Sequence, residues 1–101
     1  MIGKWKMAVK TPFGEEKYHL AIETVSPFLS GKIWTDMGSA SFENGKYDNG
    51  NLEIGFNVDT PQKAQITIRG THTKASVITG TVQVDEYPTL DFKAEYNNDN
   101  I

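Results

Sequence analysis

The chain has no cysteine among its 101 residues. This absence excludes a disulfide framework, a cysteine nucleophile and any metal site built from thiolates. Long apolar runs are missing as well, and the opening residues, Met1–Lys6, contain no stretch that could act as a signal peptide. We therefore expect a cytoplasmic protein with no membrane partner.

Clusters of like charge are also missing. The ten basic and thirteen acidic residues are scattered along the chain and give a formal net charge of only −3. Binding to nucleic acid requires a clustered basic face, so we expect no nucleic-acid partner. Lys4, Lys6 and Lys10 share one face of a predicted strand, which we interpret as a solvated face. The hydrophobic share of 38% can fill one core, which predicts a single domain over residues 1–96 with a tail at 97–101.

Proline is infrequent, and its four positions all fall between runs in which apolar and polar residues alternate. Proline cannot donate a hydrogen bond to a β-ladder, so this placement is typical of links between strands. Alternation at every second residue indicates strands with one buried and one wet face. The pattern predicts eight strands, at Lys4–Lys10, Lys17–Glu23, Phe28–Thr35, Gly38–Asp48, Asn51–Val58, Lys63–Gly70, Val77–Val84 and Leu90–Tyr96.

Eight strands with short links predict an all-β fold, an eight-stranded antiparallel up-and-down barrel, because a sheet of about eight strands closes around an interior that side chains or one small ligand can fill. A two-layer sandwich is the alternative. Asn49-Gly50 suits a hairpin turn, and Asn44-Gly45 suits a turn or a bulge. Gly31 and Gly80 lie inside strands and mark places where the barrel coils. The predicted interior comprises Leu52, Ile54, Phe56, Ile66, Ile68, Val82, Leu90 and Phe92.

The opening Gly3-Lys4-Trp5 resembles the Gly-x-Trp signature of the lipocalins and the wider calycin superfamily, in which the tryptophan closes one end of an eight-stranded barrel. With its strand-and-turn cadence, the chain is similar to small bacterial lipocalin-like barrels. The resemblance implies a fold and a capacity to hold small apolar ligands, but it carries over no set of binding residues. Lipocalins usually place an arginine near the last strand to stack on this tryptophan, whereas here that strand offers only Lys93. The only tryptophans are Trp5 and Trp34, so a similarity to avidin-like barrels does not extend to biotin binding.

Motifs for catalysis are missing. There is no Gly-x-Ser-x-Gly elbow and no glycine-rich phosphate loop ahead of a helix. The two histidines, His19 and His72, have no third ligand at a metal-binding spacing, and we expect both to be exposed, with His72 in a turn over Gly70–Lys74. We expect no metal, no cofactor and no catalytic residue, and the chain fits a binding protein better than an enzyme.

Four aromatic residues, Trp5, Tyr18, Phe56 and Tyr96, share the inward phase of their predicted strands. They could line a pocket for a small apolar or aromatic ligand, and we place that site in one barrel mouth, among Trp5, Tyr18 and Tyr96. Alternatively, they fill a small barrel completely. In that case the chain is a structural or interaction domain, or an accessory domain to an enzyme.

Phe28 and Trp34 fall on the opposite, outward phase of their strand. A large exposed aromatic side chain loses favourable free energy unless another surface covers it. Because most assemblies of soluble chains are symmetric homo-oligomers, we expect a homo-oligomer with Phe28 and Trp34 at the contact.

Overall fold

The computed structural model describes residues 2–35, 38–58 and 63–96, so the predicted tail at 97–101 lies outside the described residues. These residues form eight strands, each antiparallel to the next, and β8 pairs with β1 to close a barrel. The predicted up-and-down barrel is therefore confirmed, and the sandwich is not formed. The strands are β1 (Gly3–Thr11), β2 (Gly14–Thr24), β3 (Leu29–Thr35), β4 (Gly38–Asp48), β5 (Asn51–Val58), β6 (Ala64–Lys74), β7 (Val77–Val84) and β8 (Leu90–Tyr96).

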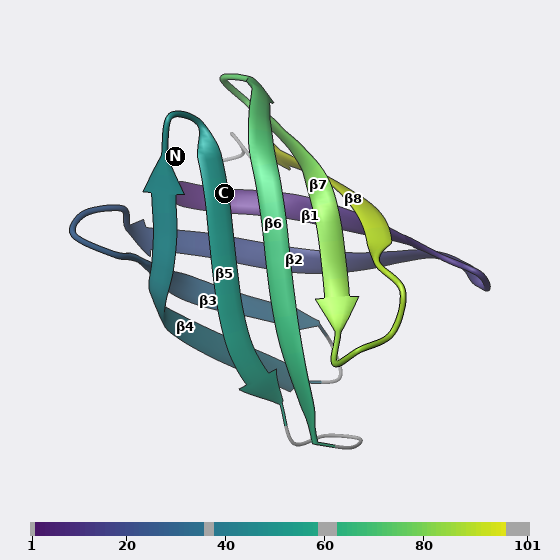
Figure 1. The fold of residues 1–101 in the computed structure, drawn as a ribbon. Coiled ribbons are helices and arrows are strands. Elements are labelled where there is room, and N and C mark those ends of the chain that lie inside the picture. The colour runs from purple at the N-terminus through teal and green to yellow at the C-terminus, as the bar shows by residue number, and fades with distance from the viewer. Residues whose placement is uncertain (1, 36–37, 59–62, 97–101) are drawn as a thin grey trace.

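In Figure 1, β1–β3 run across the back of the barrel, and β5, β6 and β7 cross them steeply in front, with β8 behind β7. Because the chain goes up and down, β2, β4, β6 and β8 all finish at the end where β1 begins. We call this the tryptophan end, since Trp5 lies there. The strands β1, β3, β5 and β7 finish at the opposite end, which we call the far end.

Two Asn-Gly pairs act as their sequence predicts. Asn49 and Gly50 join β4 to β5 with φ angles of 51° and 81°, the positive values that a two-residue hairpin turn of this hand requires. Between β3 and β4 the register moves from Leu29 opposite Gly45 to Gly31 opposite Phe42. The β4 strand thus carries one extra residue here, which is the predicted bulge.

The interior is filled by apolar side chains, and no polar side chain is buried among the residues that the structure describes. Five of the eight predicted interior residues are buried, and Phe56, Ile66 and Leu90 are half-buried against the same core. The buried set is Trp5, Met7, Val9, Leu20, Ile22, Leu29, Ile33, Phe42, Leu52, Ile54, Ile68, Ile78, Val82, Phe92 and Ala94. In the described ranges no helix is long and apolar enough to cross a membrane.

Gly31 and Gly80 allow neighbouring backbones to come very close. A Cβ on Gly31 would lie 1.9 Å from the carbonyl oxygen of Ala21, and a Cβ on Gly80 would lie 1.9 Å from that of Arg69. Each glycine also pairs with a phenylalanine, Gly31 with Phe42 and Gly80 with Phe92. The predicted strand glycines are therefore positions where neighbouring backbones approach closely.

Candidate functional site

The tryptophan end is closed by aromatic side chains. Trp5 is only 1% exposed, and its ring meets that of Tyr96 edge-on, with 5.3 Å between the ring centroids. Gly3 makes this possible: a Cβ there would lie 2.7 Å from the Tyr96 hydroxyl, and its φ of +134° is one that residues with side chains rarely adopt. In the last strand, Tyr96 rather than an arginine therefore packs on the opening tryptophan.

His72 is the residue that sequence reasoning placed wrongly. It lies within β6, opposite Ile78, and is half-buried rather than exposed in a turn. Its Nδ1 is 2.8 Å from the Tyr47 hydroxyl, and its ring centroid is 5.8 Å from that of Trp5. The sequence did contain a signal for this placement: His72 follows Ile66 and Ile68 at even spacing, which is the inward phase of the strand. The polar residues around His72 masked that pattern.

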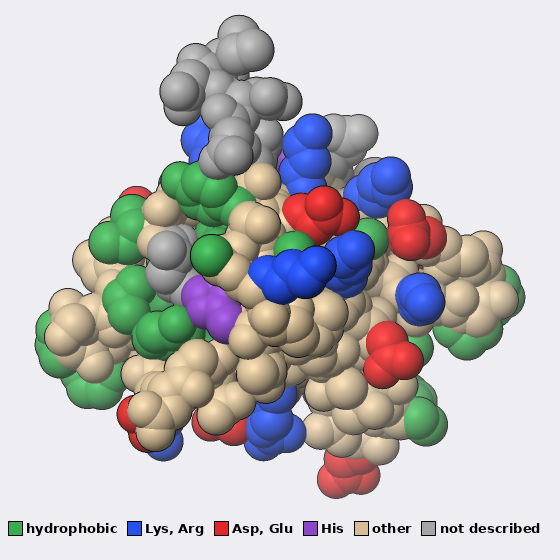
Figure 2. Space-filling model, turned by 90° about the horizontal axis from the view of Figure 1, so that it is seen from above, with side chains coloured by type: hydrophobic (Ala, Val, Ile, Leu, Met, Phe, Trp, Pro, Cys, Tyr) green, Lys and Arg blue, Asp and Glu red, His purple; other side chains and the backbone are tan. Residues whose placement is uncertain are grey.

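The environment of His72 favours the neutral imidazole. Its Nε2 is buried and has no hydrogen-bond partner. Burial lowers the pKa of His72 below its ordinary value, because removal from water disfavours the charged ring. Figure 2 shows the molecule from above, with histidine, hydrophobic and charged side chains next to one another. The ring contacts of Trp5 with Tyr96 and His72 make this end of the barrel an aromatic cluster.

At the far end, Val9, Ile33 and Val82 are buried, but several other inward-facing apolar side chains are only half-buried. Phe56 of β5 pairs with Ile66 of β6, and both pack against the core, as do Ala40 of β4 and Leu90 of β8. The most completely buried side chains, such as Ile22, Leu29, Ile54 and Ile78, lie in the middle of the barrel or toward the tryptophan end. Part of the apolar interior is thus exposed to solvent at the far end.

Tyr18 supplies a polar group on this side of the barrel. It is half-buried, and its hydroxyl donates a hydrogen bond of 2.7 Å to the exposed carboxylate of Glu16. Burial, together with the hydrogen bond and the negative charge of Glu16, raises the pKa of Tyr18 to about 12. The phenol therefore stays protonated at any physiological pH.

The four predicted ligand residues accordingly divide between the two ends. The structure brings Trp5 and Tyr96 together, whereas Tyr18 pairs with Met7, further along β1, and turns its hydroxyl toward Glu16. Phe56 lies near the far end of β5. Alternation predicted that all four point inward, but the height of each along the barrel depends on strand register.

The two predicted interface residues lie apart on the molecule. Phe28 is 52% exposed and precedes β3, while Trp34 is near the other end of that strand. Six residues of extended chain separate them, or about 20 Å. Trp34 is half-buried because His19 of β2 stacks on it, with 5.4 Å between centroids and 20° between planes. A neighbouring strand, rather than a loop, covers part of this ring.

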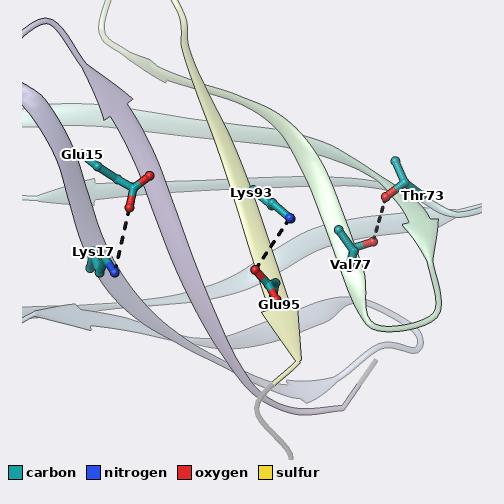
Figure 3. A network of polar contacts seen from close by, with 6 residues as sticks. All are labelled: Glu15, Lys17, Thr73, Val77, Lys93 and Glu95. Carbon is teal, nitrogen blue, oxygen red and sulfur yellow. Dashed lines mark hydrogen bonds and ion pairs between the residues drawn. The ribbon is translucent and has the colours of Figure 1, made fainter.

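The outer wall carries hollows between its charged side chains. One of about 1040 Å³ spans β7, β8, β1 and β2, and its lining includes Lys6, Ala8 and Lys10. Figure 3 shows two ion pairs on the strands that flank β1, Lys17–Glu15 at 3.9 Å and Lys93–Glu95 at 3.7 Å. These distances are long and the side chains exposed, so each pair adds little to stability.

Among the described residues, no group of three or more histidine and acidic side chains is arranged to hold a metal ion. Comparison of the chain with protein-family models, curated proteins and solved structures finds no match in any of the three. Function is therefore inferred from the chemistry of the two barrel ends and of the outer wall.

Proposed function

We propose that this protein binds a small, largely apolar or aromatic ligand at the far end of its barrel. The observation that carries the proposal is the partial exposure of inward-facing apolar side chains at the far end. Trp5 is buried at the other end, beside the more exposed Tyr96, whereas Phe56, Ile66 and Leu90 at the far end point inward and are half-buried. A ligand placed against them would remove apolar surface from water, which contributes about 25 cal/mol per Å².

Polar groups at the site restrict the chemistry of the ligand. The Tyr18 proton is engaged by Glu16, so the remaining hydrogen-bonding capacity consists of acceptor oxygens on both side chains. The proposed ligand is therefore a flat or branched hydrocarbon skeleton with at most a donor group, such as a hydroxyl or an amine. The lipocalin-like opening, Gly3-Lys4-Trp5, supports the same arrangement, because it implies a barrel closed at the tryptophan end.

The test is a titration with N-phenyl-1-naphthylamine, an uncharged probe whose fluorescence rises in apolar surroundings. We expect saturable binding by the wild-type protein. Phe56→Ser, which removes lining surface, and Ala40→Leu, which adds volume at the same end, should each weaken it about tenfold, equal to about 1.4 kcal/mol. Phe13→Ser is the matched control, since Phe13 is 99% exposed in the turn between β1 and β2.

Nuclear magnetic resonance locates the probe independently. The indole N–H signal of Trp5 reports the tryptophan end, and it should not move when the probe binds at the far end. Circular dichroism establishes that each variant is folded. The proposal fails if the folded wild type shows no saturable binding, if Phe13→Ser loses as much affinity as Phe56→Ser, or if the Trp5 signal responds most.

A further inference from the structure

The outer wall of β1, β2 and β3 gathers lysines that are far apart in the sequence. Strand pairing sets Lys6 beside His19 and His19 beside Trp34, and in the next row Lys4 beside Ala21 and Ala21 beside Lys32. Lys17 lies two residues before His19 on β2 and therefore points to the same side of the sheet. Cross-strand neighbours lie about 5 Å apart, so these side chains share one surface. We call it the lysine–tryptophan wall: Lys4, Lys6, Lys17, His19, Lys32 and Trp34.

This wall is electrostatically unlike the molecule that carries it. The chain has a net charge of −3, yet the wall holds four lysines, with Glu15 beside Lys17 and Glu95 opposite Lys6 as its acidic neighbours. Lys4, Lys6 and Lys32 form no ion pair with any described residue. Glu95 stands opposite Lys6 on β8 but pairs with Lys93. The wall therefore presents exposed positive charge around a half-buried aromatic stack.

From this placement we propose that the lysine–tryptophan wall docks an acidic, extended segment of a partner protein. Residues two apart on a strand lie about 6.7 Å apart on one face, and an extended peptide has the same repeat. Carboxylates at alternate positions of such a segment can therefore face Lys4 and Lys6 together. The Trp34–His19 stack beside them offers a flat apolar surface for one side chain of the segment.

A polypeptide fits this wall better than a nucleic acid does. Glu15, Glu23 and Glu95 stand at its edges, where they limit the acidic segment to the length of the wall and would repel a longer phosphate backbone. The wall also has a single aromatic stack, whereas surfaces for single-stranded nucleic acid use aromatic side chains in series. The inference concerns a different surface from the far-end ligand site and does not depend on it.

The experiment measures fluorescence anisotropy of a labelled peptide of alternating glutamate and serine, at low and at physiological ionic strength. We expect binding that weakens with salt and is about tenfold weaker in Lys6→Glu/Lys32→Glu, because two modest attractions become repulsions. Lys46→Glu/Lys74→Glu is the matched control, since both lysines are exposed and lie on β4 and β6. The Trp34 indole signal should move on binding while that of Trp5 stays in place.

Each alternative occupant gives a distinct result. Tighter binding of an equally long oligo-thymidine would overturn the proposal in favour of nucleic acid. A wild-type dimer in light scattering that Lys6→Glu/Lys32→Glu dissolves would overturn it in favour of a second copy of the chain. Equal loss in the control pair, or no peptide binding by the folded wild type at low ionic strength, would also refute it. Binding of N-phenyl-1-naphthylamine by Lys6→Glu/Lys32→Glu should be unchanged, which separates this test from that of the ligand site.

Discussion

Gly80→Ala should destabilise the barrel strongly, while Gly55→Ala should not. A Cβ at position 80 would lie 1.9 Å from the Arg69 oxygen and 2.6 Å from the Gly70 Cα. Both obstacles are backbone atoms, so no side-chain rotation can relieve the clash. At position 55 the nearest atom, the Ile66 oxygen, would be 3.9 Å away, an ordinary contact. Both glycines lie inside strands, which makes them a matched pair.

The size of the loss in unfolding free energy depends on how far the backbones of β6 and β7 must separate. Bringing the Arg69 oxygen to an ordinary contact distance requires β6 and β7 to move apart by more than 1 Å, which is about the scale of a damaged ladder hydrogen bond. Forced overpacking costs about 1–3 kcal/mol, and a weakened hydrogen bond about 1 kcal/mol more. Alanine returns about 0.4–1 kcal/mol by restricting the unfolded chain. We expect a net loss of about 2 kcal/mol for Gly80→Ala, and a change between zero and a small gain for Gly55→Ala.

Thermal unfolding followed by circular dichroism measures both variants. For a domain of this size, 1 kcal/mol corresponds to about 4–8 °C, so the midpoint of Gly80→Ala should fall by about 8–16 °C. The midpoint of Gly55→Ala should stay within a few degrees of the wild type. Equal midpoints for the two variants would refute the close approach of β6 and β7 at Gly80.

Two further outcomes follow from charged and titratable groups. Burial lowers the pKa of His72, so the unfolded chain binds a proton more readily than the folded one, and the free energy of unfolding should decrease as pH falls below about 6.5. Urea unfolding at several pH values should show this slope in the wild type and in the exposed control His19→Gln, but not in His72→Gln; a slope retained in His72→Gln would assign it to other groups. Arg69→Gln removes the 2.7 Å ion pair with Glu53, and because both side chains are exposed the loss in urea unfolding should stay below about 1 kcal/mol. A loss of several kcal/mol would mean that Arg69 supports the barrel in another way.

Alternation was sufficient to predict the fold because most strands have one buried face and one more exposed face. The predicted and observed bounds coincide for β4, β5, β7 and β8. In β5, for example, Leu52 and Ile54 are buried, while Asn51 and Gly55 on the other phase are exposed. The Asn49-Gly50 pair predicted the turn of the β4–β5 hairpin, since few residues adopt its positive φ values.

The extension of β6 beyond Gly70 was not predictable from hydrophobicity. Its last residues are mostly polar and exposed, and the inward position is occupied by His72 rather than by an apolar residue. A polar ring can take such a position at a barrel end because Tyr47 offers a hydrogen bond and Trp5 a flat neighbour. The partners that stabilise the His72 ring are distant from it in the sequence, so no local sequence pattern predicts its inward position.

The lysine–tryptophan wall was hidden for a related reason. Lys6 and Lys32 are separated in the sequence by a whole strand, and composition alone describes them as scattered charge. The observed register places β1, β2 and β3 side by side, so outward-pointing residues of the three strands become neighbours across the sheet. The inward positions of the same strands are fixed by packing around Gly31 and the core, whereas the outward ones are free to vary. A barrel of this size can therefore carry a binding wall outside without disturbing the interior that its stability requires.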